Sequence, residues 1–153
     1  MRVHVEEARR DHLPPILDDI RPADLREWAA GTGSADLQAG LESVFREGRF
    51  ARAACDEDGR ALCMWGVDGM PDGAGWVWLF ATNRAVPLFL PIHRHLKAEL
   101  EIILSRWPIL HAYSDARNSM HHRWLEWLGF EHVEDVHLGP FGLPFKHYTK
   151  EST

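Results

Sequence analysis

Tyr113 and His121, whose side chains can transfer protons, lie close together in the sequence with Asn118 between them. The unperturbed pKa of imidazole lies close to neutrality, so a histidine that faces a pocket can accept or donate a proton during a reaction. If this stretch is helical, His121 falls in the apolar arc between Leu125 and Leu128. It is therefore either a hydrogen-bonded core residue or a group that faces a pocket. We keep Tyr113 and His121 as candidate catalytic residues.

The spacing of apolar residues predicts a helix within residues 115–130, between strands at 109–114 and 131–138. The apolar residues expected on one face of this helix stand at i, i+4, i+7 and i+8, and they are Met120, Trp124, Trp127 and Leu128. His122 and Glu126 fall on the opposite face, where a pair at i, i+4 is worth a few tenths of a kcal/mol. We expect Asp115 or Asn118 to cap the helix start and Gly129 to adopt the left-handed conformation after its end.

This stretch resembles the last helix of the GCN5-related N-acetyltransferase (GNAT) superfamily, which typically reads Asn-x-x-Ala-x-x-Leu-Tyr-x-x-Leu-Gly-Phe. The positions that match in register are Asn118, Leu128, Gly129 and Phe130, whereas His121, Trp124 and Leu125 differ. Residues 76–149 more closely resemble acetyltransferase-like proteins of tailed bacteriophages, including internal virion (core) proteins of podophages. This second resemblance rests on three short sequence segments: Asp-Ala-Arg-Asn, Arg-Trp-Leu-Glu-Trp-Leu-Gly-Phe and Gly-Pro-Phe-Gly-Leu-Pro-Phe.

The order of predicted elements agrees with the fold that this resemblance implies. A strand at 2–8 is followed by helices at 11–20, 23–30 and 34–48, the last capped by Ser34, and then by strands at 49–55, 60–67 and 76–82. A long amphipathic helix then runs from about 88 to 107, and strands at 131–138 and 143–149 close the chain. We predict one α/β domain over residues 1–153, an α+β mixed sheet of about six to seven strands with helices on both faces.

Two predictions concern the strand at 76–82. Its continuous apolar run indicates a central strand that is covered on both faces. The long helix that follows makes a crossover to the strand at 109–114, so these two strands should be parallel neighbours.

The resemblance implies acetyl-CoA as a cofactor, held at the turn between the central strand and the long helix. The family's usual run there is Arg or Gln, two residues, Gly, one residue, and Gly or Ala. Arg84 matches, but Pro87 and Phe89 replace the two small residues. Because proline has no amide hydrogen and phenylalanine is large, the pyrophosphate loop is degenerate and we expect weak or absent binding.

The resemblance also implies a pantetheine groove at the ends of the central parallel strands. Backbone groups of Phe80, Ala81 and Thr82 and the side-chain amide of Asn118 would line it. The tyrosine that usually protonates the leaving thiolate is replaced by Leu125. Acetyl transfer to an amine also needs a route for the amine's proton and a donor for the leaving thiolate. Tyr113, on the preceding strand, is the candidate for the missing donor, and His121 is a candidate catalytic group if it faces a pocket.

Composition restricts the classes of partner. The net charge is −6, with 17 Lys and Arg against 23 Asp and Glu, and no cationic cluster that would neutralise phosphates stands out, so we expect no nucleic-acid partner. The sequence has no run of 18 apolar residues and no apolar signal core, so we expect no membrane association and a cytoplasmic protein.

Cys55 and Cys63 are expected to be free buried thiols on opposite faces of a hairpin, with Cys55 across from Leu62. No zinc-type spacing of ligands is present, so we expect no metal site.

Two hypotheses follow from the resemblance. The first is a phage-type N-acetyltransferase that transfers acetyl from acetyl-CoA to a small-molecule or protein amine in the host cytoplasm. The second is a non-catalytic protein of the same fold that contacts other virion proteins, either inside the particle or during assembly.

Overall fold

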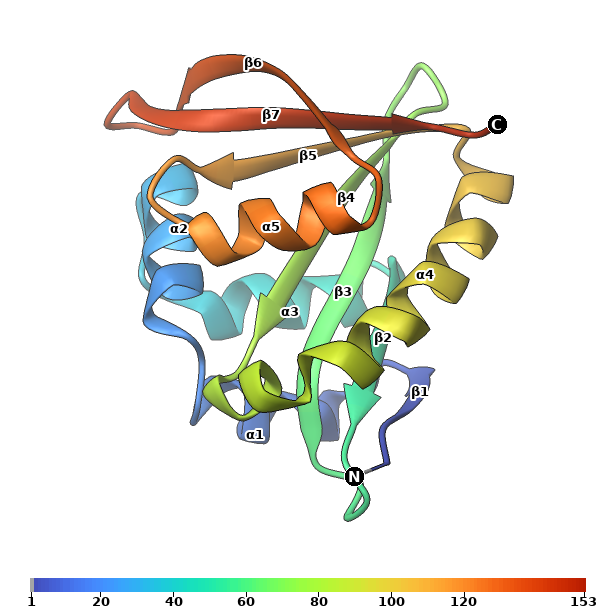
Figure 1. Ribbon diagram of the computed structural model, residues 1–153. Coiled ribbons are helices and arrows are strands. Elements are labelled where there is room, and N and C mark those ends of the chain that lie inside the picture. The colour runs from blue at the N-terminus through green and yellow to red at the C-terminus, as the bar shows by residue number, and fades with distance from the viewer. Residues whose placement is uncertain (1) are drawn as a thin grey trace.

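The computed structural model describes residues 2–153, which form one mixed sheet with helices on both faces (Figure 1). The strand order is β1-β2-β3-β4-β5-β7-β6, with bounds β1 His4–Glu7, β2 Phe50–Cys55, β3 Ala61–Gly69, β4 Gly75–Ala81, β5 Ile109–Asp115, β6 Glu131–Leu138 and β7 Leu143–Glu151. The helices are η1 Arg10–His12, α1 Leu13–Leu17, α2 Pro22–Thr32, α3 Leu37–Arg46, η2 Asn83–Leu88, α4 Phe89–Arg106 and α5 Ser119–Trp127. The predicted mixed sheet of six to seven strands is confirmed.

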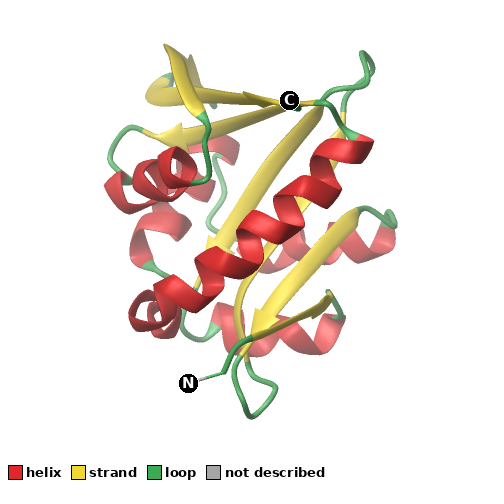
Figure 2. Ribbon diagram, turned by 45° about the vertical axis from the view of Figure 1, so that its right-hand side comes forward, coloured by secondary structure: helices red, strands yellow, loops and turns green. Residues whose placement is uncertain are grey.

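The sheet divides the core into two parts, and helices cover the part on each face (Figure 2). The larger part lies under α4 and α5 and includes Ile92, Ile103 and Trp124. The smaller part lies under α1, α2 and α3 and includes Ile16 and Leu41. Within the described residues, none of the helices is both long and apolar enough to cross a membrane.

β4 and β5 are parallel neighbours, as the crossover predicts, but they pair over two residues only. The register joins Gly75 to Leu110 and Trp76 to His111, and no pair follows. Beyond that point the two strands diverge toward their carboxyl ends (Figure 1). The edge of β4 that faces β5 is therefore left without a strand partner.

The prediction that the strand at 76–82 is central and covered on both faces is confirmed, since its side chains belong to the core on each face of the sheet, but the cover is incomplete. β4 is the fourth strand of seven, but Trp76 is 44% exposed, and Val77, Trp78 and Leu79 are only half-buried. The divergence from β5 removes a neighbour on one side, so the apolar side chains of β4 line open space. The apolar run thus marks cavity walls as well as core.

The two cysteines are free and buried, as expected, and they contribute to different parts of the core. Burial raises the pKa of the Cys55 thiol to about 12, with a further contribution from Glu6, and burial likewise raises the pKa of Cys63 to about 12. The predicted pairing of Cys55 with Leu62 is wrong because the register shifts after Ala54 and places Cys55 opposite Ala61.

Two of the predicted helix details also differ. The third helix is capped by Asp36, whose carboxylate accepts a hydrogen bond of 3.1 Å from the Ala39 N–H, rather than by Ser34. At α5, Asn118 is the N-cap residue, but its side chain makes no capping bond. Gly129 has φ 92°, which confirms the predicted left-handed position.

The polar and apolar faces of α5 are rotated from the prediction. Trp127 is 53% exposed, while His122 is buried and bonds through Nε2 to the Asp115 carbonyl oxygen at 2.9 Å. Glu126 accepts a hydrogen bond of 3.2 Å from the Tyr148 hydroxyl. The predicted surface pair of His122 and Glu126 is therefore wrong, because docking of α5 against β7 turns both side chains toward other partners.

Gly66 is a position where any side chain would be expected to destabilise the fold. A Cβ there would lie 2.3 Å from Cζ2 of Trp78 and 2.5 Å from the Phe50 carbonyl oxygen. We expect Gly66→Ala to lower the free energy of unfolding by about 1–3 kcal/mol, measured by urea denaturation. In the control Gly31→Ala the new Cβ lies 3.8 Å from its nearest neighbour, so this helical substitution should be neutral or stabilising. Equal stability of both variants would contradict the expectation.

Candidate active site

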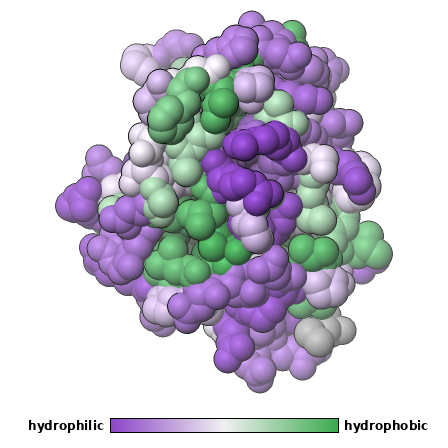
Figure 3. All heavy atoms as spheres, turned by 90° about the vertical axis from the view of Figure 1, so that its left-hand side faces the viewer, coloured by the Kyte–Doolittle hydropathy of each residue, from purple (hydrophilic) through white to green (hydrophobic). Residues whose placement is uncertain are grey.

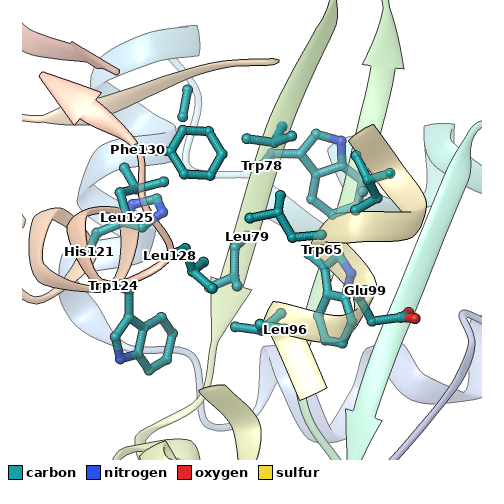
Figure 4. A pocket seen from close by; sticks show the side chains of 15 residues that line it. Trp65, Trp78, Leu79, Leu96, Glu99, His121, Trp124, Leu125, Leu128 and Phe130 are labelled. Carbon is teal, nitrogen blue, oxygen red and sulfur yellow. The ribbon is translucent and has the colours of Figure 1, made fainter. Parts of the chain in front are cut away.

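Two cavities lie on either side of the gap between β4 and β5. A cavity of about 60 Å³ lies between the sheet, α4 and α5 (Figure 4), and one of about 510 Å³ lies on the other face, next to α2, α3 and the β6–β7 turn. Both are lined by the same four residues, Val77, Trp78, Leu79 and His121. The divergence of the strands therefore brings the two cavities to a common wall, and His121 stands in it.

The backbone of β4 presents polar groups to this gap. On the side that faces β5, the Ala81 N–H donates to Asp24 Oδ2 at 2.8 Å, and the Ala81 carbonyl accepts from the Arg21 N–H at 3.0 Å. On the opposite side, the Thr82 N–H donates to the Leu62 carbonyl of β3. Backbone direction alternates with period two, so Leu79 faces the gap as Ala81 does. Its amide is the donor that the divergence leaves without a strand partner.

His121 and Glu27 form a pair beside the gap. Nδ1 of His121 lies 3.2 Å from Oε2 of Glu27 and 3.4 Å from Oε1. The Ser114 hydroxyl and the Asp115 N–H donate to the same Oε1 at 3.0 Å and 2.6 Å. Within residues 2–153, Nε2 of His121 makes no hydrogen bond to another side chain or to the backbone. In the neutral imidazole, this carboxylate favours the tautomer with its proton on Nδ1, which leaves the Nε2 lone pair available.

The pKa of His121 reflects two opposing effects. Burial lowers it, but the charge and hydrogen bond of Glu27, with a smaller contribution from Asp24, more than offset burial, so the pKa lies above its usual value. A buried histidine held by a carboxylate is an arrangement typical of general acid–base groups. The arrangement can accept a proton from a group in the gap.

Tyr113 faces the larger cavity, together with Trp76. Its ring stacks on that of His147 at 4.5 Å between centroids and meets the Trp76 ring edge-on at 5.2 Å. Burial, and to a lesser extent Glu134, raises the pKa of the Tyr113 hydroxyl. The structure therefore brings both predicted catalytic residues, Tyr113 and His121, to the walls of one cavity.

The predicted pantetheine-contacting groups at the end of β4 have partners within the chain. Phe80 pairs with Met64 of β3, so its backbone faces away from the gap. Thr82 donates both its N–H and its hydroxyl to the Leu62 carbonyl. Both backbone groups of Ala81 are engaged, as described above. These contacts point to Leu79, one step earlier along the strand, as the residue with free backbone at the gap.

Asn118 belongs to a buried polar network that joins α2 to the end of β4. Its Nδ2 donates to Asp24 Oδ1 at 3.0 Å, and its Oδ1 accepts from Nη2 of Arg21 at 3.4 Å. Arg21 also donates to Asp24 at 2.8 Å. Burial raises the pKa of the Asp24 carboxyl, against the opposing effects of His121, Arg21 and the Ala81 amide. The network fixes α2 beside the gap and thereby positions Glu27.

Arg84 is held by the N-terminal segment. Its Nη2 donates to the carbonyl oxygens of Pro15 and Ala61 at 3.1 Å and 3.0 Å, and its Nε lies 3.2 Å from Asp19 Oδ2. The Arg84 N–H donates to the same carboxylate oxygen, and the Asn83 N–H donates to the Asp19 carbonyl. The first two amides of the turn after β4 are therefore already bonded to Asp19, the Asn83 N–H to its carbonyl and the Arg84 N–H to its carboxylate.

Aromatic rings fill the space between the start of α4 and the end of α5. Phe89 stacks on Trp124 at 5.3 Å and contacts Trp127 at 4.7 Å between centroids, and His93 stacks on the other side at 5.6 Å. Pro87 lies within the 3-10 turn η2 just before. We call these four residues, Phe89, His93, Trp124 and Trp127, the ring cluster.

The residues that sequence reasoning missed are on α2. Asp24 and Glu27 stand at i, i+3 of a short helix and so share one face. Two acids on the face that packs toward the sheet were the available signal, because unpaired carboxylates are rarely buried. Apart from Arg21, their partners lie 57 to 94 residues further along the chain, which spacing alone could not indicate.

One further cluster lies at the sheet edge, far along the chain from α5. His4, Glu6 and Cys55 have ligand-type atoms within 4.8 Å of one another, brought together by the pairing of β1 with β2. Glu6 is already paired with Arg9 at 3.0 Å and His12 at 2.7 Å. These contacts hold its pKa at about 2, chiefly through the His12 hydrogen bond. The cluster fastens the N-terminal strand to its neighbour.

Neither a protein-family model nor a curated protein sequence matches the chain, whereas solved structures do. An N-acetyltransferase from Staphylococcus aureus Mu50 superposes with a TM-score of 0.71 at 14% identity, covering 99% of both chains. The chain has the GNAT fold. A ribosomal-protein-alanine N-acetyltransferase from Brucella melitensis gives 0.70 at 18% identity over 97% of this chain and 99% of that one. The protein yncA from Salmonella typhimurium, whose structure contains acetyl-CoA as its cofactor, gives 0.62 at 13% over 97% and 93%.

At these identities the likeness is one of fold, because a GNAT fold can be kept while its site changes. At the centre of this GNAT-fold chain, β4 and β5 diverge, and the His121–Glu27 pair lies beside the gap between them. In the turn after β4, the Asp19 carboxylate accepts from the Arg84 N–H, and the ring cluster lies next to this turn.

Proposed function

We propose that this protein is an N-acyltransferase that transfers an acyl group from a thioester donor of the acetyl-CoA type to an amine. The observation that carries the proposal is the gap between β4 and β5, where His121 and Leu79 line both cavities. In this proposal the amine enters from the larger cavity and the donor from the smaller. The two reactants then meet at the free edge of β4.

The residues of this chain fit one end of such a donor and not the other. The apolar gap and the free Leu79 amide suit a pantetheine arm and a thioester carbonyl. The turn after β4 does not suit a pyrophosphate, because Pro87 offers no amide and Arg84 is held by Asp19. The cavity beneath α4 and α5, at about 60 Å³, must also widen to admit the arm. In this proposal the pantetheine groove is supported by the residues around it, which are Phe80, Ala81, Thr82, Arg84 and Asn118.

Each step of the proposed reaction is assigned to a group of this chain. When bound, the donor supplies an activated carbonyl. Nε2 of His121 accepts the proton that the attacking amine must lose as the C–N bond forms, and Glu27 stabilises the imidazolium that results. As the C–S bond breaks, the imidazolium returns this proton to the leaving thiolate, which departs as the free thiol. The Leu79 amide is placed to donate to the carbonyl oxygen as charge develops there. Tyr113, on the wall of the amine cavity, orients the acceptor through its ring and hydroxyl.

The test is release of free coenzyme thiol from acetyl-CoA that depends on an added amine, with the acylated amine identified by mass spectrometry. We expect turnover with a panel of primary amines and none without them. Thiol release that is independent of amine, or no release at high donor concentration, would exclude the proposal.

Donor binding provides a separate prediction. We expect weak binding of acetyl-CoA to the native chain, and binding tighter by about tenfold in Pro87→Gly with Phe89→Gly, because a recovered amide bond to a charged group is worth about 1.5–3 kcal/mol. Leu90→Gly, at an exposed neighbouring position, serves as the control and should not tighten binding. Calorimetric titration measures all three proteins. Micromolar binding by the native chain, unchanged by the two glycines, would contradict the expectation.

A second candidate function is favoured by the ring cluster. Trp127 and Leu90 are 53% and 64% exposed on α5 and α4, beside rings that close the donor entrance. Such an apolar surface suits contact with another protein, and a GNAT-fold chain that has lost donor binding could be kept for that contact. Under this alternative the partners would be other virion proteins of a phage. Association with particles rather than with the host cytoplasm would distinguish it.

A further inference from the structure

Six of the twenty residues that line the 510 Å³ cavity are Trp, Phe or Tyr. The rings that line it come from α2, β4, β5 and β7: Trp28, Trp76, Trp78, Phe80, Tyr113 and Phe145. Its volume is in the range that accommodates a drug-sized molecule. Apolar side chains also gather among polar ones on the side of the molecule that holds α2 and the β6–β7 turn (Figure 3). A ligand in this cavity would therefore bury mainly apolar surface.

The charged groups in these walls are already engaged with each other. Asp68 accepts from Arg49 at 3.0 Å and from the Trp78 indole at 3.4 Å. Arg49 also bonds to Ser43 and pairs with Glu47. No carboxylate is left free on these walls within the described residues to bind a cation brought by a ligand.

Small polar groups in the walls are satisfied in the same way. The Thr32 hydroxyl donates to the Trp28 carbonyl at 2.7 Å, and the Ser43 hydroxyl donates to the Gly40 carbonyl at 2.6 Å. At the inner end, the Glu27 carboxylate accepts from Ser114 and from the Asp115 amide, as described above. Within the described residues, the polar groups of the walls that have no hydrogen-bond partner include Nε2 of His121 at the gap, the Tyr113 hydroxyl, and the buried Trp28 Nε1 and Arg49 Nε. None of them is a carboxylate.

We propose that the acceptor is a primary amine on an aromatic body, of the arylalkylamine class, and that polyamines are rejected. This inference rests on the proposed acyl transfer for its reaction, and on the cavity alone for its binding. The amine group reaches the gap beside His121 while the ring lies between Trp76 and the other aromatic walls. A second ammonium group, as in a polyamine, would be removed from water without a carboxylate partner.

Trp76 is the residue on which this selectivity depends most. It is partly exposed at the cavity wall and is held edge-on by Tyr113. Contact between aromatic rings contributes beyond the burial of apolar area. Removing the indole would therefore weaken binding of an aromatic amine more than binding of an aliphatic one.

The experiment is calorimetric titration of the native chain with tryptamine, phenethylamine and spermidine in the absence of any donor. We expect both aromatic amines to bind at least about tenfold more tightly than spermidine, and Trp76→Ala to reduce tryptamine affinity by about tenfold. Trp127→Ala is the matched control, because this tryptophan is similarly exposed but lies outside the cavity. Circular dichroism checks that both variants fold.

The outcomes separate this inference from the proposed function. Aromatic binding that Trp76→Ala weakens supports the amine site, even if no acyl transfer is then found. Spermidine binding equal to or tighter than tryptamine, or a Trp76→Ala variant that matches Trp127→Ala, overturns it. Acyl transfer to spermidine but not to tryptamine would also overturn the inference while the proposed reaction stands.

Discussion

Replacing His121 with glutamine is expected to lower the rate of amine-dependent thiol release by about 10²–10⁴-fold, the range usual for loss of a general base. Glutamine keeps a polar side chain of similar reach but cannot accept the amine's proton. The Michaelis constant for the amine should change little, because the aromatic walls remain. Steady-state kinetics with saturating donor measures both quantities.

His122 provides the control for this substitution. It is the next residue of α5 and is as deeply buried, but it lines neither cavity and bonds to the Asp115 carbonyl instead. His122→Gln should retain most of the activity. If His122→Gln and His121→Gln lose activity equally, with equal losses of stability, then His121 acts through folding and not as a base.

The dependence on pH gives the same residue an independent readout. Since Glu27 raises the pKa of His121, the base is unprotonated only above that raised value, so activity should rise with pH through it. Glu27→Gln should move this limb to lower pH and reduce the maximum rate. The protonated pair adds stability that is fully present below the unfolded histidine pKa of about 6.5 and is lost as pH rises through the folded value. A pH profile unchanged in Glu27→Gln would contradict the pairing.

Replacing Asp24 with alanine is expected to reduce the free energy of unfolding by about 3–5 kcal/mol, because Arg21 would remain buried without its partner. The Ala81 amide and the Asn118 amide would lose an acceptor in the same step. For a chain of this length the loss corresponds to a decrease of roughly 10 °C in the melting temperature. Differential scanning calorimetry measures it directly.

Asp18→Ala is the corresponding control. Asp18 is exposed at the end of α1, and substitutions at such positions usually change stability by no more than about 0.5 kcal/mol. A melting temperature of Asp24→Ala within 2–3 °C of the control would show that the buried network adds little, on the usual scale for a chain of this size. Activity should also fall in Asp24→Ala, since the network positions Glu27.

Local pattern was sufficient for much of the fold. Alternation and 3.6-residue spacing located the strands and helices, and the long helix after β4 required β4 and β5 to be parallel. The left-handed conformation of Gly129 was predictable because few other residue types adopt it. These features depend on neighbours within a few residues, which is the range over which a sequence pattern carries information.

The candidate site depended on longer distances. His121 was identified as a core or pocket residue, but its partner Glu27 lies 94 residues earlier, and only the docking of α2 against β5 and α5 brings them together. The same docking places Asn118 beside Asp24, whereas the packing of α5 against β7 turns His122 inward and leaves Trp127 exposed. By itself the sequence determined the elements, the parallel crossover and the residues able to transfer a proton. The tertiary structure decided which of them meet, because side-chain partners are set by packing between elements that spacing along the chain does not encode.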